Sequence, residues 1–275
     1  MQKIISDIAK AVEDIRIKSP LAGSWTNFVT IEFVANTQLA VGARAAMCFL
    51  PDEAKPLASV SAAIYINLGT LEPVAAQALP EAAKAAVQSG KPWVLDPVAA
   101  GLGETRNAVI RELKNYPPSI IRGNASEIIT LANLWGLESF GKGKAEGVDA
   151  CDTVQEAFGP AKALAGYTGG TAAVSGEVDL IVENNKAYNI TGGCEMLKRI
   201  TGAGCSLGGV MAAFAAVTDS LTAALAGSLA YKWASENAER SKGTASFRNS
   251  FIDNLSLLTP SCIAEYAGRH LREAE

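Results

Sequence analysis

The stretch KPWVLDPVAAGLGETRNAVIRELKNYPPSIIRGNASEI, residues 91–128, decides the fold. Its two ends are short apolar runs, KPWVLDPV (91–98) and PSIIRGN (118–124), each bounded by proline or polar residues in the manner of buried strands. Between them, ETRNAVIRELKN (104–115) carries its apolar residues at helical spacing. A strand, a helix and a second strand in this order predict two parallel strands joined by a helical crossover.

The same alternation continues on both sides of this stretch. Before it, AAIYINLG (62–69) is a predicted strand and PVAAQALPEAAKAAVQSG (73–90) is a predicted Ala-rich helix. After it, ASEIITLANLWG (125–136) and TVQEAFGPAKALAG (153–166) are predicted helices, and TAAVSG (171–176) is a predicted strand. Repeated strand–helix units predict an α/β fold with a mainly parallel central sheet and helices on both faces.

The two ends of the chain carry the remaining predicted elements. The first twenty residues mix acidic and basic side chains at helical spacing, which predicts an amphipathic surface helix and not a secretion signal. VDLIVENNKAYNIT (178–191) is predicted to be a hairpin that turns at Asn184-Asn185. We expect a single domain over residues 1–275, with the charged segment 141–150 as a surface loop. Further helices are predicted near 205–218, 219–239, 245–257 and 260–273.

Composition narrows the class of protein. The 275 residues are 49% hydrophobic and 19% charged, which is typical of globular chains and not of disordered ones. The net charge of −4, with scattered basic residues, argues against nucleic-acid binding, because phosphate backbones attract basic patches. The chain has 5 cysteines and no Cys-x-x-Cys pair, which argues against a disulfide framework or a zinc site and favours a reducing, cytoplasmic compartment.

An uncharged stretch from Ile200 to Thr218 is long enough to span a bilayer. Its first half is Thr, Gly, Cys and Ser, and the rest is mostly Ala, so it holds few of the large apolar residues that drive insertion. We therefore predict a buried helix of an α/β protein, and no membrane is expected as a partner.

The start of that stretch, TGAGCSLGG (201–209), places Gly202, Gly204 and Cys205 before a helix. Glycines let a ligand approach the backbone closely, and free N–H groups at a helix start attract anions, phosphate above all. Cys205 would lie inside such an anion site, where a helix N-terminus lowers the pKa of a thiol. The alternative is a packing turn with a small buried cysteine. No Walker loop is present and no G-x-G-x-x-G is complete, so a dinucleotide site is not predicted.

Polar residues at the ends of successive predicted strands form a second group of candidates. In open parallel sheets, ligands bind beyond the carboxyl ends of the strands. Asp96 and Glu127 are candidate magnesium ligands there, and Arg122 is a candidate phosphate clamp. The structural alternatives are an Asp-Pro turn for Asp96 and a salt bridge for Arg122. For Glu127 the alternative is an acid in the first turn after a capping Asn124. The single histidine, His270, is expected on a solvent-facing terminal helix, which argues against a histidine-based triad.

A set of short segments stands in order along nearly the whole chain: TNFVT (26–30), VANTQLAVGA (34–43), INLGTL (66–71), VLDPVAAG (94–101), IIRGNASEI (120–128), VSGEVD (174–179) and ITGAGCSLGG (200–209). Together they resemble the hydroxyethylthiazole kinases of the ribokinase-like superfamily, and the combination of RGNASEI with TGAGC is the most specific part. The resemblance implies a ribokinase-like fold and ATP- and magnesium-dependent phosphorylation of the primary alcohol of 4-methyl-5-(2-hydroxyethyl)thiazole in thiamin salvage. It also implies a homotrimer with thiazole sites at the subunit boundaries.

The resemblance implies roles for single residues as well. On the acceptor side, Met47 would line the thiazole pocket and Gly202 would contact the thiazole alcohol, with Asn27 and Asn36 supporting this side of the cleft. The residues implied on the nucleotide side are Arg122, Ser175 and Gly204 for ATP, and Asp96 and Glu127 for magnesium and phosphate.

Cys205 stands, by this resemblance, where the sugar and vitamin kinases of the superfamily carry an aspartate that accepts the alcohol proton. Phosphoryl transfer depends mostly on positioning and charge stabilisation, so a modest base such as a thiol suffices. We therefore expect Cys205→Ser to leave the fold intact but slow turnover, and Cys205→Asp to remain active.

Two departures from the family's pattern concern the acceptor half of the site. SPLAGSWTN (19–27) lacks the histidine that usually precedes TNFVT. GARAAM (42–47) replaces the usual GASPxM, which places Arg44 near the expected thiazole wall or, alternatively, in solvent or at a subunit boundary. These departures leave open a kinase of a related hydroxyl-bearing heterocycle or pyrimidine, and a non-catalytic binding protein on the same fold. A flavin or nicotinamide oxidoreductase would be a third class, but the chain lacks a complete dinucleotide loop.

Overall fold

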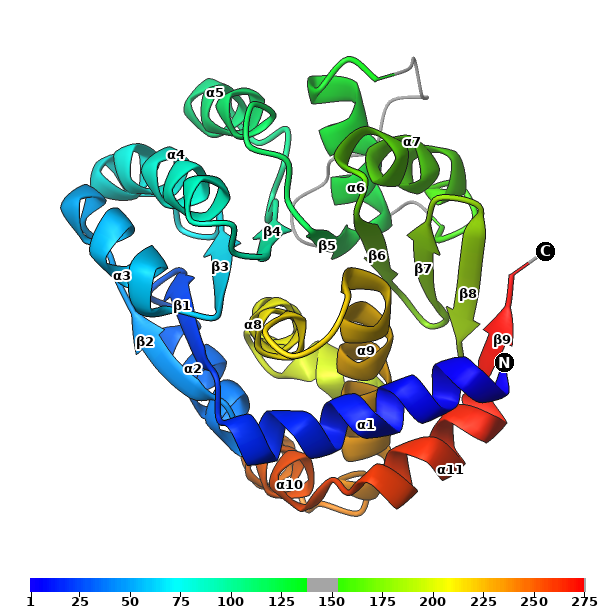
Figure 1. The fold of residues 1–275 in the computed structure, drawn as a ribbon. Helices are drawn as coiled ribbons and strands as arrows, with labels where there is room; N and C mark the ends of the chain where they lie inside the picture. Colours follow the sequence, from blue (N-terminus) through cyan, green and yellow to red (C-terminus); the bar gives the residue numbers. More distant parts are fainter. Residues whose placement is uncertain (138–152, 275) are drawn as a thin grey trace.

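A single curved sheet organises the molecule, and the computed structural model describes it over residues 1–137 and 153–274. Its first six strands in the chain run parallel to one another, and the last three continue the sheet in antiparallel fashion. Figure 1 shows the sheet curving from β2 on one side to β9 on the other. In sheet order the strands are β2 (Arg44–Met47), β1 (Leu21–Trp25), β3 (Ala63–Asn67), β4 (Trp93–Asp96), β5 (Ile120–Asn124), β6 (Thr171–Ser175), β7 (Asp179–Glu183), β8 (Lys186–Ile190) and β9 (Leu271–Glu273).

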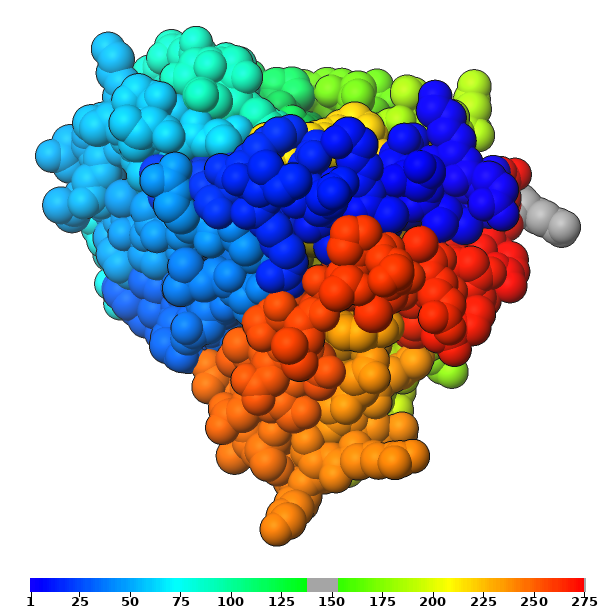
Figure 2. All heavy atoms as spheres, turned by 60° about the horizontal axis from the view of Figure 1, so that its bottom comes forward, coloured from blue at the N-terminus to red at the C-terminus, as the bar shows by residue number. Residues whose placement is uncertain are grey.

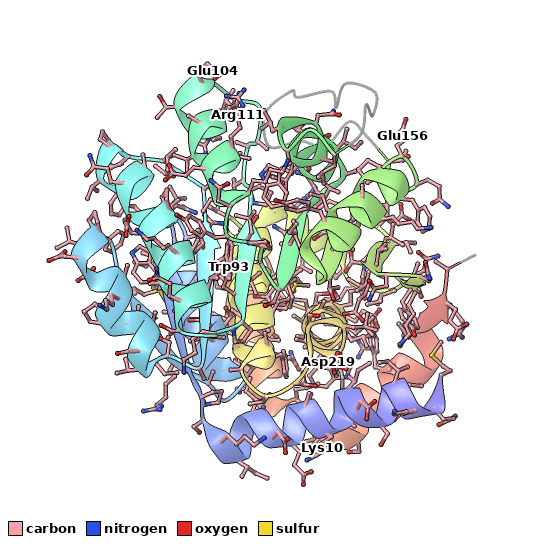
Figure 3. The ribbon with its side chains drawn as sticks, turned by 45° about the horizontal axis from the view of Figure 1, so that its top comes forward. Lys10, Trp93, Glu104, Arg111, Glu156 and Asp219 are labelled. Atoms are coloured by element: carbon pink, nitrogen blue, oxygen red, sulfur yellow. The ribbon has the colours of Figure 1, made fainter. Side chains whose placement is uncertain are left out.

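The convex face of the sheet carries one set of helices (Figure 1). Successive side chains of a strand point to opposite faces, so Ile64 and Ile66 of β3 pack under these helices while Tyr65 packs on the other side. Trp93 lies on β4 within the molecule, whereas Glu104 and Arg111 lie at its outer surface (Figure 3). The helices on this face are α3 (Ala54–Val60), α4 (Pro73–Gln88), α5 (Glu104–Leu113), α6 (Ala125–Leu134) and α7 (Phe158–Thr168), and a short 3-10 helix, η1 (Pro51–Glu53), precedes α3.

The concave face carries a second set of helices, which form a separate apolar core with the sheet. Two of them lie closest to the strands, α8 (Ala203–Ala215) and α9 (Ser220–Asn237). Figure 2 shows the N-terminal helix lying across this side of the molecule beside the C-terminal helices. The outer members are α1 (Gln2–Lys18), α2 (Ile31–Ala40), α10 (Thr244–Leu257) and α11 (Pro260–His270), and the 3-10 helix η2 (Glu195–Arg199) precedes α8.

The predicted architecture is confirmed, because a mainly parallel sheet has helices on both faces. The amphipathic N-terminal helix is α1, which buries Ile8, Val12 and Ile15. The predicted hairpin is β7–β8, and Asn184 at its turn has a φ of 50°, in the left-handed region that asparagine tolerates. The segment 141–150, predicted to be a surface loop, lies outside the described residues.

Three details of the prediction are wrong or missing. The helix predicted over 153–166 begins only at Phe158, because Pro160 lacks an N–H and fits only the first turn of a helix. The helix predicted over 260–273 ends at His270, and the next three residues form β9 against β8. Strands β1 and β2 and helices α2 and α3 were not predicted.

The uncharged stretch that begins at Ile200 forms α8 and the turn after it, packed on the sheet. Across the described ranges, 1–137 and 153–274, no helix combines the length and the apolar composition needed to cross a bilayer.

Candidate active site

The carboxyl ends of the central parallel strands bring polar side chains to one edge of the sheet. The strand register places Asn67, the last residue of β3, beside Asp96, the last residue of β4. It places Asn124, at the end of β5, beside Ser175, at the end of β6. The expectation that these strand ends meet at one edge is therefore confirmed.

The glycine-rich loop delivers Cys205 to this edge. Gly202 has a φ of 88°, a conformation that favours glycine, and its carbonyl accepts the Ser206 N–H at 2.8 Å as α8 begins. The helix can lie close against the sheet because Gly208 has no side chain: a Cβ there would lie 2.5 Å from the ring of Tyr65. Helix α8 begins at the carboxyl ends of the strands, where the Cys205 carbonyl accepts from Tyr65. Its first N–H groups have no partner within the helix and therefore lie free at this edge of the sheet.

Cys205 sits between an amide and a buried carboxylate. Asn27 Nδ2 points at its Sγ from 3.7 Å, and Tyr65 Oη donates to its carbonyl oxygen at 2.6 Å. Burial, with the nearby charge of Asp96, raises the pKa of the Cys205 thiol to about 11. The expectation of a lowered pKa is wrong, because burial outweighs the effect of the helix N-terminus.

Asp96 is fully buried at the centre of a polar cluster. Its Oδ2 accepts hydrogen bonds from Tyr65 Oη at 2.9 Å and from Asn67 Nδ2 at 3.0 Å. Burial raises the pKa of Asp96, and the Arg122 guanidinium opposes that rise. Asp96 is thus more than the residue before a proline turn, since its side chain points inward to four polar contacts with three neighbours.

Arg122 links this carboxylate to the next strand. Its Nη1 lies 3.5 Å from Asp96, and its Nε and Nη2 donate to Ser175 Oγ at 3.2 Å and 2.9 Å. Burial by itself lowers the pKa of Arg122, but the carboxylates of Asp96 and Glu127 raise it above its ordinary value. A Cβ on Gly204 would lie 2.8 Å from Arg122 Nη1, so the guanidinium also lies against the glycine-rich loop.

Glu127 makes the contacts of a helix cap with Asn124, which was the structural alternative to a role in magnesium binding. Its Oε2 accepts the Asn124 N–H at 2.8 Å while Asn124 Oδ1 accepts the Glu127 N–H at 2.9 Å, which is a reciprocal cap of α6. Its Oε1 accepts the N–H of Ala99 at 3.1 Å. Burial and the charge of Asp96 raise the pKa of Glu127, which shows that the two carboxylates interact.

The remaining predicted residues lie at different distances from this cluster. Met47 ends β2 and packs, half-buried, against the apolar core of the concave face. Asn36 donates to Glu32 on its own helix rather than to any member of the cluster. Arg44 is exposed and donates to the Ser19 carbonyl at 2.9 Å, so it faces away from the cluster, as its solvent alternative expected.

His270, expected to face solvent, is only half exposed at the end of α11. Its ring stacks on Tyr266 with centroids 4.1 Å apart, and its Nδ1 lies 3.2 Å from Thr191 Oγ1.

Two residues of the cluster were missed. Tyr65 stands in an apolar run and has the sequence signature of a core residue, and nothing in that run shows that its hydroxyl reaches Asp96. Asn67 lies in the strand-exit turn NLGT, and its position at a strand end was the available signal. Its Oδ1 accepts from Asn27 Nδ2 at 2.8 Å, so Asn67 joins the acceptor side to the buried carboxylate.

A narrow cavity of about 20 Å³ borders the cluster at Asn27 and Asn67. Its wall also includes Phe28 and Phe49, whose rings stack with centroids 5.1 Å apart. The volume is about that of one water molecule, so this is a small pocket that is aromatic at Phe28 and Phe49 and polar at Asn27 and Asn67.

The carboxylates at this edge of the sheet fit a magnesium ion whose remaining ligands are water and phosphate oxygens. Among residues 1–137 and 153–274, no group of three histidine, cysteine, aspartate or glutamate side chains could hold a metal ion. Asp96 and Glu127 supply two interacting carboxylates against the single positive charge of Arg122. Magnesium is commonly bound by one or two carboxylates, with water and substrate phosphates completing its shell.

Comparison with solved structures first defines the class of protein. A ribokinase-like superfamily protein from Enterococcus faecalis has the same fold, with a TM-score of 0.62 at 12% identity over 97% of this chain and 95% of that one. A pyridoxal kinase from Staphylococcus aureus, in complex with ADP, gives a TM-score of 0.60 at 15% identity over 79% and 87%. These likenesses show the fold alone, which this chain shares with ribokinase-like proteins.

The particular family follows from closer relatives. The model of the hydroxyethylthiazole kinase family matches residues 12–261. Hydroxyethylthiazole kinase from Bifidobacterium longum subsp. infantis is 48% identical over 95% of this chain and 90% of its own, and that from Leptospira interrogans is 39% identical over 92% and 94%. The structure of the Pyrococcus horikoshii hydroxyethylthiazole kinase has a TM-score of 0.86 at 31% identity and covers 100% of both chains. The chain belongs to the hydroxyethylthiazole kinase family.

Proposed function

We propose that this protein transfers the γ-phosphoryl group of ATP to the primary hydroxyl of 4-methyl-5-(2-hydroxyethyl)thiazole, as a step of thiamin salvage. The observation that carries the proposal is the position of Cys205. It lies at the start of α8, with the Asn27 amide on one side and the linked Asp96 and Arg122 pair on the other.

The nucleotide side of the site binds the triphosphate. Arg122 offers a planar fork of donors beside Ser175, which suits a phosphate oxygen. The N–H groups that begin α8 face the same edge, and the absence of a side chain at Gly204 leaves them open. These groups stabilise the charge on the transferred phosphoryl oxygens, which is the main demand of a loose transition state.

The acceptor side orients the attacking hydroxyl. Because the pKa of Cys205 is about 11, the side chain is a neutral thiol at physiological pH. It therefore positions the alcohol by a hydrogen bond, and it does not remove the proton beforehand as a thiolate would. The alcohol proton leaves as the bond to phosphorus forms and passes to an oxygen of the transferred phosphoryl group, because that group is already electron-poor when the alcohol oxygen attacks.

Asp96 and Glu127 would hold the magnesium ion that accompanies ATP. The ion supplies positive charge that neutralises the phosphate oxygens. In this proposal Glu127 keeps its second duty as the cap of α6, so the cap fixes the position of the carboxylate.

The position of Arg44 supports the thiazole over other acceptors. This departure from the family's pattern made a different heterocycle an alternative, but the guanidinium binds the Ser19 carbonyl at the exposed start of β2. No added charge therefore reaches the acceptor side of the same subunit from this residue.

The test is a coupled assay of ADP release with a panel of alcohols: the thiazole alcohol, aminopyrimidine methanol, pyridoxal and ribose. We expect release that requires both the thiazole alcohol and magnesium. Binding of the thiazole without turnover would favour a non-catalytic binding protein, and a faster reaction with another alcohol would replace the acceptor. Arg122→Ala is the negative control, since it removes the phosphate fork.

We further propose a cytoplasmic homotrimer whose acceptor sites lie at the subunit boundaries. Support comes from exposed apolar side chains next to the acceptor side, Phe28 at 51%, Val29 at 64% and Leu50 at 50% exposure. The described cysteines Cys48, Cys194, Cys205 and Cys262 are all free, as a reducing compartment favours. Sedimentation equilibrium tests the oligomer, and a monomer at micromolar concentration would contradict it.

A further inference from the structure

Thr30 stands at a helix start without capping it. It occupies the N-cap position of α2, where a threonine hydroxyl usually accepts an N–H from the first turn, yet its side chain makes no such bond. The residue is only 5% exposed. Its Oγ1 is buried and, within the described part of the chain, has no hydrogen-bond partner.

The surroundings of Thr30 are the reacting half of the site. A Cβ on Gly202 would lie 2.8 Å from Thr30 Cγ2, so Thr30 packs directly against the glycine-rich loop. The Thr30 N–H donates to the Asn27 carbonyl at 3.1 Å, in the turn that carries the amide next to the thiol. The Thr30 hydroxyl is close enough to Cys205 to lower its pKa slightly against the larger effect of burial.

An unpaired buried hydroxyl is unfavourable for the protein alone. It loses its hydrogen bonds to water on folding and gains only the weak contact with the Cys205 thiol in return. Thr30 also forgoes the stabilisation that capping α2 would provide. A valine would fill the same space without burying an unsatisfied hydroxyl, so the hydroxyl needs a partner that the free chain does not supply.

We propose that Thr30 Oγ1 hydrogen-bonds the hydroxyl of the acceptor alcohol and holds it between Gly202 and Cys205. A threonine hydroxyl both donates and accepts, as does the alcohol, so the two groups are complementary. The inference rests on the proposed function and adds a specificity-determining residue to it: Thr30 selects acceptors that carry a hydroxyl at this point.

The test compares two probes in calorimetric binding to the full-length protein. The first is the thiazole alcohol, and the second is 5-ethyl-4-methylthiazole, which has the same ring and no hydroxyl. We expect Thr30→Val to weaken binding of the alcohol by about three- to tenfold, the usual net value of a neutral hydrogen bond, and to leave binding of the ethyl compound unchanged. Thr30→Ser, which keeps the hydroxyl, should retain the preference for the alcohol.

Thermal unfolding supplies a second readout with the opposite sign. Thr30→Val should melt at a higher temperature than wild type, because it removes an unsatisfied buried hydroxyl. The matched control is Thr37→Val on the same helix, where Oγ1 donates to the Val34 carbonyl at 3.0 Å. This control should melt at a lower temperature and bind both probes as wild type does.

Equal weakening of both probes by Thr30→Val, or no weakening of either, would overturn the inference. Failure of the proposed function would appear in the wild-type protein, as absent ADP release with the thiazole alcohol. Failure of the inference alone would appear only in the comparison between wild type and variant.

Discussion

At the scale of the residue, burial has a larger effect than neighbouring charges on the pKa values of the side chains in the site. Asp96 is an acid with no exposure to solvent, and Cys205 is a thiol held against the core. Burial raises the pKa of both groups, while Arg122 favours the ionised form of each. At pH 7 the Cys205 side chain is therefore a neutral thiol, and it lies beside a buried acid that is linked to Arg122.

The first prediction concerns the pH at which Cys205 reacts. The thiol has an ordinary pKa of 9.0 in the unfolded chain and about 11 in the folded one. The folded protein therefore holds this proton more tightly, and the stability it contributes is present below pH 9.0 and lost as the pH rises towards 11. Alkylation by iodoacetamide, followed by mass spectrometry of the Cys205 peptide, should keep accelerating above pH 10. A plateau reached by pH 9 would contradict the raised pKa.

The second prediction is that the Cys205 thiol positions the alcohol. Cys205→Ser should keep the wild-type fold by circular dichroism and lower kcat on the order of tenfold, because the shorter C–O bond draws the hydrogen-bonding atom back from the alcohol and weakens that contact. Cys205→Asp should remain active, because a carboxylate accepts a hydrogen bond at the same place. A wild-type kcat in the serine variant would remove the thiol from the mechanism.

The third prediction uses the absence of a side chain at Gly204, next to Arg122. A methyl group at this position would lie 2.8 Å from Arg122 Nη1, so Gly204→Ala should displace the guanidinium and raise the KM for ATP about tenfold, with a smaller change for the thiazole. Gly166→Ala is the matched control, because a Cβ there meets no atom within 4 Å on α7. It should leave activity unchanged and stabilise the protein by about 0.5 to 1 kcal/mol.

The residue scale also shows what the sequence could predict of the site. Asp96 and Ser175 end their strands and Arg122 lies two residues before the end of β5, and position together with family resemblance was enough to single them out. Tyr65 could not be found in this way, since its hydroxyl reaches Asp96 from the neighbouring strand, and that pairing is not visible in the residues around Tyr65. The orientation of Asn36 likewise depends on Glu32 on the same helix and not on the motif that contains it.

At the scale of the element, α9 holds together the two loops behind the nucleotide side. Lys232 of α9 is 6% exposed and lies 3.5 Å from Asp179. Its Nζ also donates to the carbonyls of Glu177 at 3.0 Å and Gly192 at 3.2 Å. The turn after Ser175 and the segment that leads into the glycine-rich loop therefore share one buried anchor.

The fourth prediction tests that anchor. Lys232→Met leaves Asp179 buried without its ion-pair partner, so the free energy of unfolding should fall by about 3 kcal/mol in urea titration. The double variant Lys232→Met, Asp179→Asn removes both charges and should recover a large part of that loss. Equal losses in the single and double variants would show that the ion pair is not the source.

Elements differ in how well the sequence predicted them, for physical reasons. Strands β3 to β6 are buried on both faces and appear as continuous apolar runs. Strand β1 contains Gly23, although glycine is a poor strand former. Glycine is required there because a Cβ would lie 2.7 Å from Ser61 Oγ of the segment packed over the strand. That requirement comes from tertiary packing, and no local pattern in residues 21–25 reveals it.

At the scale of the whole molecule, one sheet separates two apolar cores, and the site lies where the strands of the sheet end. The order and type of the layers follow from the alternation of strands and helices, so this part of the fold was predictable. The antiparallel extension through β9 was not, because Leu271, Arg272 and Glu273 have no strand pattern of their own. Only pairing with β8 makes them a strand.

That last strand has a practical consequence for handling the protein. It covers the outer edge of β8, with Leu271 beside Ile190 and Glu273 beside Tyr188. A truncated chain ending at His270 would present unpaired backbone groups along that edge, which invites stacking of one molecule onto another. We expect such a truncation to scatter light on concentration while the intact chain stays clear. An affinity tag at this end would accordingly need a spacer that leaves these three residues free to pair.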